Sequence, residues 1–169
     1  MGKKLIYQTQ HKEKGMLMIK IKLEDSHVSV NDNSKTKKSI LEKVSDLLSK
    51  SSGVCRNDIF KKLYEREKLG STSIGKGVAI PHARVQDIEY PFISIITLDE
   101  PVEFDNIDSL DVDIIVSIIV PEENYSNHLE LLAYLSSKLD DPDVRKKLRQ
   151  ARNSSQIIEN LYSKDLEFI

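Results

Sequence analysis

The segment from Asp111 to Val120, DVDIIVSIIV, most narrows the range of folds open to this chain. It is almost continuously β-branched, and the segment Phe92–Leu98 upstream (FISIITL) has the same character. β-branched residues favour strands, and a strand that is apolar on both sides needs cover on both faces of its sheet. We therefore expect an α/β fold: a single domain with a mixed β-sheet flanked by helices on both faces.

Helical periodicity appears on either side of these segments. Apolar residues from Ile40 to Leu48 recur at the spacing of one helix face, which predicts a helix ending near Lys50. Further helices are expected to begin near Asn57, near Ser126 or Asn127, at Pro142, and after a capping Ser154. The alternation of Ile19, Ile21 and Leu23 with charged residues predicts a short strand at the start of the fold.

Composition limits the class of protein. The chain has 169 residues, 39% hydrophobic and 31% charged, which is typical of one soluble globular domain. A formal net charge of -2 offers no electrostatic attraction to nucleic acid or to an anionic membrane. We expect residues 1–15 to be a flexible arm or an artificial extension, and residues 16–169 to be the domain.

The cellular compartment is inferred from two further features. The lone Cys55 cannot form an internal disulfide, which favours a reducing compartment, and its simplest interpretation is a small buried side chain. The basic, polar N-terminus lacks the apolar core of a secretory signal. A cytoplasmic location is the expectation.

The candidate site lies in the segment Arg66–Arg84, REKLGSTSIGKGVAIPHAR. A glycine-rich turn leads into a short apolar strand, Val78–Ile80, which delivers Pro81 and His82. Proline fixes the backbone just before the histidine. A neutral imidazole has a nitrogen lone pair that can attack phosphorus or take a proton. A purely structural histidine is the alternative.

Two other chemistries are weakly supported. Gly70–Lys76 matches the first seven positions of a nucleotide-binding P-loop, but Gly77 replaces the Ser or Thr that should follow, and the segment follows a helix rather than a strand. The loop Gly70, Ser71 and Thr72 nevertheless offers backbone N–H groups and hydroxyls to an anion, although an ordinary glycine-rich connection is equally consistent. His82 and His128 lack the spacing of metal ligands, so no metal or other cofactor is expected.

Arg66 and His128 are predicted to point inward. Arg66 lies seven residues after Ile59 and three after Leu63, on the apolar side of its helix. It is either one half of a structural salt bridge, for instance with Glu67, or a guanidinium held for a phosphate or carboxylate. His128 lies on the apolar stripe of the predicted third helix.

The run GSTSIGKGVAIPHA resembles the signature of the IIA domains of the bacterial phosphotransferase system, of the fructose, mannitol and nitrogen-regulatory type. REKLGST upstream, and FDNID and Asn127-His128-Leu129 downstream, agree with it. The resemblance extends over roughly Lys37 to Leu161 and is strongest to the stand-alone nitrogen-regulatory member.

The resemblance implies a phosphoryl carrier. His82 would be phosphorylated on Nε2 by a phosphohistidine carrier protein of the HPr or NPr type, with His128 and Arg66 stabilising the phosphate beside the loop Gly70, Ser71 and Thr72. It implies no ATP and no metal. The next partner would be a IIB protein, in a sugar-specific branch, or a regulatory target. In the latter case the phosphorylation state of His82 would select the partner without onward transfer.

Overall fold

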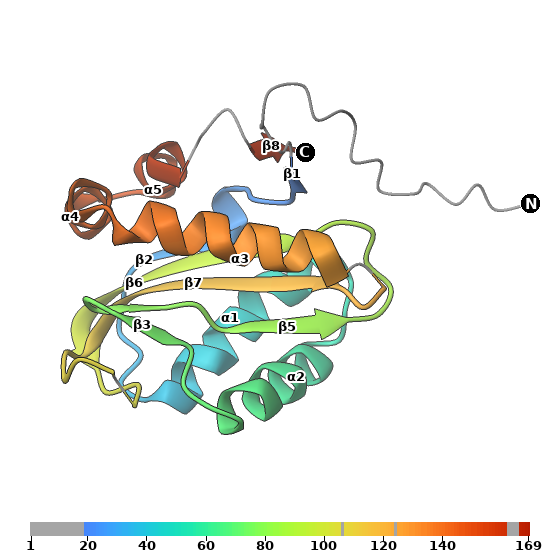
Figure 1. Ribbon diagram of the computed structural model, residues 1–169, viewed down its shortest axis with the longest axis horizontal. Helices are drawn as coiled ribbons and strands as arrows, with labels where there is room; N and C mark the ends of the chain where they lie inside the picture. The colour runs from blue at the N-terminus through green and yellow to red at the C-terminus, as the bar shows by residue number, and fades with distance from the viewer. Residues whose placement is uncertain (1–18, 106, 124, 162–165) are drawn as a thin grey trace, which may run out of the picture.

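The computed structural model describes residues 19–105, 107–123, 125–161 and 166–169 (Figure 1). The expected arm over residues 1–15 lies outside them. In chain order the elements are β1 (Ile19–Ile21), the 3₁₀ helix η1 (Asp25–His27), β2 (Val28–Asp32), α1 (Lys37–Ser52), α2 (Arg56–Lys68), β3 (Ser73–Gly75), β4 (Val78–Ala79), β5 (His82–Val85), β6 (Phe92–Val102), β7 (Val112–Pro121), α3 (Tyr125–Asp140), α4 (Pro142–Gln150), α5 (Ser154–Leu161) and β8 (Leu166–Phe168).

The main sheet is mixed, as the β-branched segments predict. Its strands follow the order β2-β6-β7-β4-β3, and β5 also pairs with β7. β6 and β7 are antiparallel, whereas β2 is parallel to β6, and both β4 and β5 are parallel to β7. β4 and β5 therefore line the same side of β7 one after the other. A separate two-stranded sheet joins β1 to β8 in parallel.

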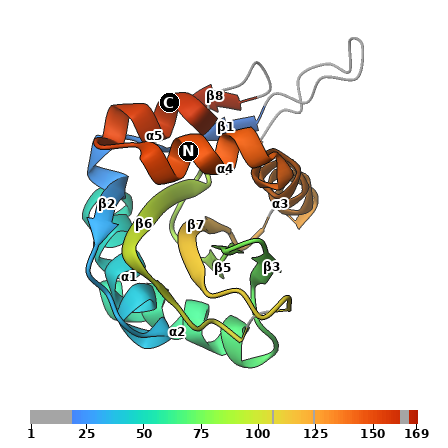
Figure 2. The same cartoon turned by 90° about the vertical axis from the view of Figure 1, so that its left-hand side faces the viewer.

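The central strand β7 is covered on both faces, and successive residues belong to opposite cores. Ile114, Val116 and Ile118 pack in the core beneath α3, α4 and α5. Ile115 and Ile119 pack in the core beneath α1 and α2. Figure 2 shows the two helical layers on either side of the sheet. The predicted α/β arrangement is thus confirmed, and the two cores explain why this strand has so few polar residues.

Local signals account for the helix ends. Thr36 caps α1 by accepting a hydrogen bond from the Ser39 N–H at 3.0 Å, and Gly53 ends it in a left-handed conformation at φ 75°. Asp141 caps α4, and Pro142 occupies its first turn as predicted. The start and end of α1 and the start of α4 therefore lie where the sequence provides the required groups.

Two local predictions were wrong. Ser154 does not cap α5; the Asn153 carboxamide accepts the Gln156 N–H at 3.0 Å, and Ser154 is the first helical residue. Cys55, expected to be buried, is exposed. It is the N-cap residue immediately before α2, outside the helix face on which Ile59 and Leu63 pack into the core.

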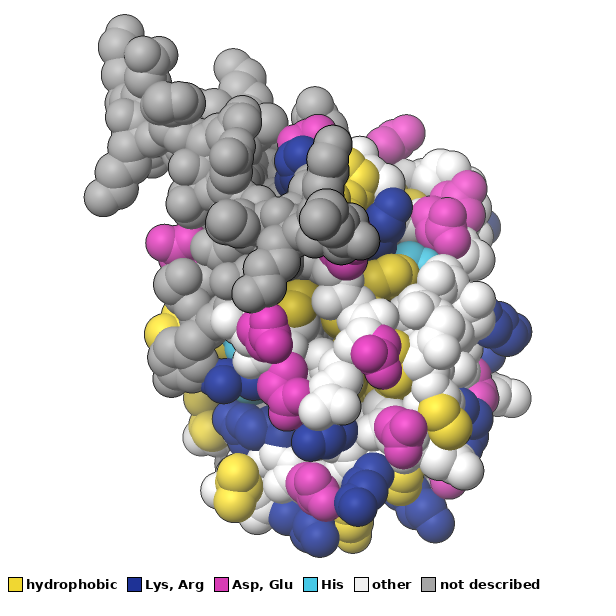
Figure 3. All heavy atoms as spheres, turned by 90° about the vertical axis from the view of Figure 1, so that its right-hand side faces the viewer, with side chains coloured by type: hydrophobic (Ala, Val, Ile, Leu, Met, Phe, Trp, Pro, Cys, Tyr) yellow, Lys and Arg dark blue, Asp and Glu magenta, His cyan; other side chains and the backbone are white. Residues whose placement is uncertain are grey.

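Surface charge is mixed in sign. On the described part of the face seen in Figure 3, Lys and Arg side chains lie among Asp and Glu side chains. This agrees with the formal net charge of -2.

Candidate functional site

His82 lies at a break between two short strands. β4 ends at Ala79, Ile80 and Pro81 interrupt the pairing, and β5 starts at His82, opposite Ile118 of β7. The histidine was expected at the end of a strand, but it begins the second half of an interrupted one. Its neighbour Ala83 packs into the core under α2, so the alternating strand geometry directs His82 to the other face, where it is half-buried.

The orientation of the His82 ring leaves one nitrogen available. Its Nδ1 lies 2.8 Å from the carbonyl oxygen of Ile80, which can only accept a hydrogen bond. The neutral ring therefore carries its proton on Nδ1 and its lone pair on Nε2. Burial lowers the pKa of His82, and the nearby Arg66 charge lowers it too, against opposing effects of the Ile80 bond and Glu67. His82 is thus neutral near pH 7.

His128 lies directly beside His82. The two ring centroids are 5.5 Å apart, and the rings are tilted by 77° to each other. His128 is buried at 6% exposure, and neither ring nitrogen has a hydrogen-bond partner among the described residues. Burial, with the charges of His82 and Arg84, lowers the pKa of His128 to about 4. It is therefore neutral near pH 7, and an unpaired polar group in such a place calls for an explanation.

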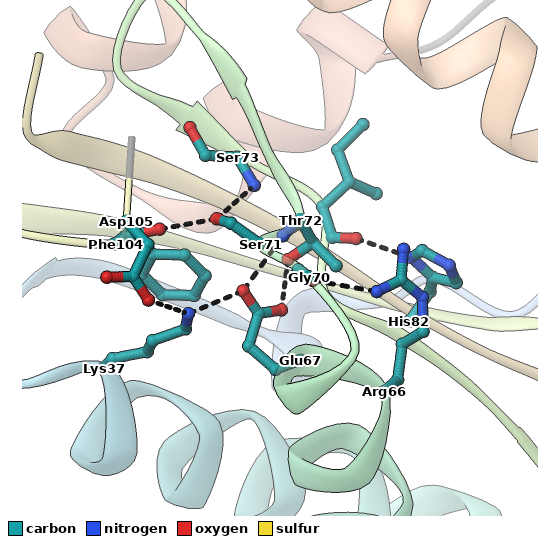
Figure 4. A network of polar contacts seen from close by, with 11 residues as sticks. Lys37, Arg66, Glu67, Gly70, Ser71, Thr72, Ser73, His82, Phe104 and Asp105 are labelled. Carbon is teal, nitrogen blue, oxygen red and sulfur yellow. Dashed lines mark hydrogen bonds and ion pairs between the residues drawn. The ribbon is translucent and has the colours of Figure 1, made fainter. Parts of the chain in front are cut away.

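Arg66 lies near His82, in the last turn of α2. It is half-buried, and its Nη1 donates to the carbonyl oxygen of Gly70 at 2.9 Å (Figure 4). Within the described chain it has no carboxylate partner, so the salt bridge with Glu67, one of the two alternatives, is not formed. Its positive charge lowers the pKa of His82. Four of the five guanidinium N–H donors are not used by the Gly70 bond.

Sequence reasoning missed the importance of Glu67. This carboxylate, and not Arg66, occupies the buried position of α2 after Ile59 and Leu63. It accepts hydrogen bonds from the Thr72 N–H at 2.9 Å and the Thr72 hydroxyl at 2.6 Å, and it pairs with Lys37 at 2.8 Å. The spacing of four residues between Ile59, Leu63 and Glu67 was the available signal.

The loop Gly70, Ser71 and Thr72 lies next to Arg66, but its hydroxyl groups are already engaged (Figure 4). Ser71 donates to the carbonyl oxygen of Phe104 at 2.6 Å, and Thr72 donates to Glu67. Neither hydroxyl hydrogen is available to an anion without breaking one of these bonds. Of the two alternatives for this loop, these contacts favour a structural connection over direct donation of the two hydroxyls to an anion.

The P-loop interpretation is excluded by the hairpin that β3 and β4 form. Lys76 and Gly77 are its two-residue turn, with φ of 57° and 80°, and no helix follows. The Lys76 ammonium pairs with Asp140 of α3. A Cβ at position 77 would lie 2.6 Å from Arg149 and 2.8 Å from Asp113, so a side chain could not fit without displacing them.

Two broader properties complete the description. No group of three or more His, Cys, Asp or Glu in the described ranges is arranged to hold a metal ion. None of the described helices combines the length and the apolar composition required to cross a membrane.

Comparison with known proteins identifies the family. Residues 22–164 match the family described as "Phosphoenolpyruvate-dependent sugar phosphotransferase system, EIIA 2". The chain belongs to this family. A nitrogen regulatory protein of Pseudomonas aeruginosa is 41% identical to this EIIA domain over 123 residues, which are 72% of this chain and 80% of the relative.

Solved structures agree with the fold. The nitrogen regulatory protein IIA-Ntr from Neisseria meningitidis superposes on this EIIA domain with a TM-score of 0.79 and 34% identity, over 82% of this chain and 95% of that one. The IIA protein in a complex of enzyme IIA-mannitol with phosphorylated enzyme IIB-mannitol from Escherichia coli has a TM-score of 0.71 over 83% of this chain and 97% of that one. At 20% identity this second likeness concerns the fold alone.

Proposed function

We propose that this EIIA domain is a phosphoryl carrier, in which Nε2 of His82 accepts a phosphoryl group from a phosphohistidine carrier protein of the HPr or NPr type. The observation that carries the proposal is the proximity of two rings whose centroids lie 5.5 Å apart. His82 has its Nδ1 bound to the Ile80 carbonyl oxygen, and the nitrogens of His128 have no hydrogen-bond partner among the described residues. Family membership supports the same chemistry.

The transfer is an exchange of one N–P bond for another. The Nε2 lone pair of His82 attacks the phosphorus of the donor's phosphohistidine. As the new bond forms, the donor's N–P bond breaks and its electron pair returns to the donor imidazole. The proton of His82 stays on Nδ1, where the Ile80 carbonyl stabilises the positive charge that the ring acquires. No proton needs to move.

His128 and Arg66 would stabilise the phosphoryl oxygens. Arg66 has further N–H donors in a planar fork suited to phosphate. His128 is neutral, so it is a donor through one ring nitrogen; once a phosphoryl group adds charge of about −1.5 to −2 nearby, the pKa of His128 should rise and its second nitrogen can protonate. Donors positioned where charge develops are a major source of rate in such transfers.

A protein donor fits the surroundings better than a small anion. Leu69, three residues after Arg66, is 86% exposed, and Leu129, next to His128, is 52% exposed. Apolar side chains beside a polar site suit a protein partner. The E. coli mannitol complex, in which a IIA protein is bound to a phosphorylated IIB protein, suggests a IIB protein as a candidate acceptor.

The direct test is labelling with phosphoenolpyruvate, the general phosphotransferase enzyme and its carrier protein. We expect one acid-labile, base-stable phosphate per chain, as a phosphohistidine requires. His82→Ala should abolish the label. Absence of label on the unmodified protein, or label that survives His82→Ala, would overturn the proposal.

A regulatory role is the second candidate, because the names of the relatives at 41% and 34% identity are those of nitrogen regulatory proteins. The charge added at His82 would change which partner docks beside the site. Pull-downs with the phosphorylated protein and with His82→Ala should then capture different partners. Rapid onward transfer to a sugar-specific IIB protein, with identical pull-downs, would favour the sugar branch instead.

A further inference from the structure

Four hydrogen bonds, in three successive steps, connect the Glu67 carboxylate to the His82 ring. Glu67 accepts both the N–H and the hydroxyl of Thr72, at 2.9 Å and 2.6 Å. The Thr72 carbonyl oxygen accepts the Ile80 N–H at 2.9 Å, and the Ile80 carbonyl oxygen accepts Nδ1–H of His82 at 2.8 Å. Each bond holds the residue whose carbonyl oxygen accepts the next one.

Glu67 is firmly held at the start of this chain of bonds (Figure 4). Its side chain is 3% exposed, and Lys37 of α1 neutralises it at 2.8 Å. Lys37 also pairs with Asp105 at 3.0 Å and lies over the Phe104 ring, 4.8 Å from the centroid. A buried carboxylate with all of these partners has little freedom to move.

A second tether holds the other side of the same loop. Ser71 donates to the Phe104 carbonyl oxygen at 2.6 Å and accepts the Ser73 N–H at 3.1 Å. Glu67, Thr72, Ser71, Phe104 and Lys37 therefore form a closed ring of contacts around the loop. Thr72 is the member of this ring that reaches toward His82, through its carbonyl oxygen.

We infer that Glu67 is a positioning residue, which acts through Thr72 and Ile80 to hold the His82 ring with Nδ1 protonated and Nε2 presented for phosphoryl transfer. The inference rests on the proposed function for the role of Nε2. The alternative is that Glu67 only stabilises the fold. The two roles predict different tautomers of His82 when Glu67 is replaced. A merely structural carboxylate would not change the tautomer of His82 in a folded variant.

The first experiment reads the tautomer directly. ¹⁵N NMR of histidine-labelled full-length protein, at a pH where His82 is neutral, should show one dominant Nδ1–H tautomer. Glu67→Ala removes both bonds to Thr72, and Thr72→Val removes the hydroxyl bond. We expect both variants to give a mixture with the Nε2–H tautomer, larger in Glu67→Ala.

Conservative variants separate geometry from charge. In Glu67→Gln the amide oxygen can still accept the Thr72 N–H, and the amide nitrogen can donate to the Thr72 hydroxyl. Thr72→Ser retains the hydroxyl. We expect both to keep the wild-type tautomer. Glu65→Ala, on the exposed side of the same helix, is the matched control and should change nothing.

The second experiment measures transfer from the phosphorylated carrier protein at a series of carrier concentrations. Loss of ring orientation should reduce the maximal rate about 10-fold in Glu67→Ala, while the carrier concentration at half-maximal rate stays within about 2-fold of wild type. Thr72→Ser should restore most of the rate that Thr72→Val loses. Circular dichroism confirms that each variant is folded.

The outcomes distinguish the two proposals. A folded Glu67→Ala with the wild-type tautomer, or with an unchanged maximal rate, overturns the positioning role. A loss seen only in the carrier concentration at half-maximal rate also overturns it, because Glu67 would then act in docking. If wild-type protein takes no label, the proposed function fails, but the tautomer measurement needs no phosphoryl donor and still decides whether Glu67 orients His82.

Discussion

Two buried histidines in different parts of this EIIA domain differ in how their ring nitrogens are paired. His27, in η1, is 1% exposed; its Nδ1 donates to the Ile93 carbonyl oxygen at 3.1 Å, and its Nε2 accepts from the Ser51 hydroxyl. His128, in α3, is 6% exposed, and its ring nitrogens have no hydrogen-bond partner among the described residues. Burial lowers the pKa of both rings.

This contrast shows that burial alone does not identify a functional histidine. A buried polar group without a hydrogen bond destabilises the fold by about 1–3 kcal/mol. Such a group therefore indicates a role other than stability. The pairing of His27 explains it as part of the fold. The lack of pairing at His128, next to His82, fits a donor kept for a phosphoryl group. The following predictions test this distinction, and they run from the largest expected effect to the smallest.

Acidification should destabilise the fold through His128. Its folded pKa of about 4 lies below the ordinary value of 6.5, so its contribution is complete above pH 6.5 and is lost as the pH falls toward 4. The full shift corresponds to about 3 kcal/mol. Urea unfolding of wild type and His128→Gln at pH 7 and pH 4 measures this, and the variant should lose less stability. Equal losses in the two proteins would contradict the assignment.

Removing the His128 ring should slow phosphoryl transfer without abolishing it. We expect His128→Ala to reduce the maximal rate roughly 100-fold, because a donor to the developing negative charge is lost. The final amount of label on His82 should be unchanged. Rapid-quench measurements of single-turnover transfer provide the rate. If His128→Ala transferred at the wild-type rate, His128 would have no role in transfer and would not differ from His27 in this respect.

Removing the His27 ring should destabilise the fold without slowing phosphoryl transfer. His27→Ala leaves a cavity and unpairs the Ile93 carbonyl, and we expect the free energy of unfolding to fall by about 2 kcal/mol. Transfer to His82, measured where the variant is folded, should be unchanged. Ser51→Ala, which removes one partner only, should have a smaller effect on unfolding. A slowed transfer in folded His27→Ala would show that both histidines serve the site.

Arg66 is expected to affect the rate of phosphoryl transfer, as His128 is, but less strongly. Arg66→Ala should slow transfer about 10-fold, since the proposed phosphate contacts and the bond to Gly70 at the end of α2 would be lost together. Arg66→Lys keeps the charge but not the planar fork, so it should recover only part of the rate. Lys68→Ala, on the same helix, is the matched control. An Arg66→Ala rate equal to that of the control would exclude a role in transfer.

Part of this protein was predictable from short-range pattern. The apolar run in β7 predicted a strand covered on both faces, and the i, i+3 and i+4 spacings located the helices, because both periods are properties of the backbone itself. The sequence Pro81-His82 after a glycine-rich turn also marked the candidate nucleophile. These features need no knowledge of distant residues.

Contacts between residues far apart in the sequence could not be predicted from local periodicity. The pairing of β1 with β8 joins the two ends of the described chain, and the division of one edge into β4 and β5 depends on the register of β7. The predicted helix placed Arg66 on the buried side, whereas α2 packs against β5 with Glu67 buried and Arg66 only half-buried.

The sequence alone determined the elements and the residue types available for chemistry, since these follow from backbone geometry and side-chain character within a few turns of chain. The tertiary structure alone decided that the Ile80 carbonyl holds Nδ1 of His82 and that Glu67 supports Thr72, which in turn binds Ile80. It also decided that His128 lies beside His82 with no hydrogen-bond partner among the described residues. Hydrogen bonds depend on distances of tenths of an ångström, and only the packed chain sets such distances.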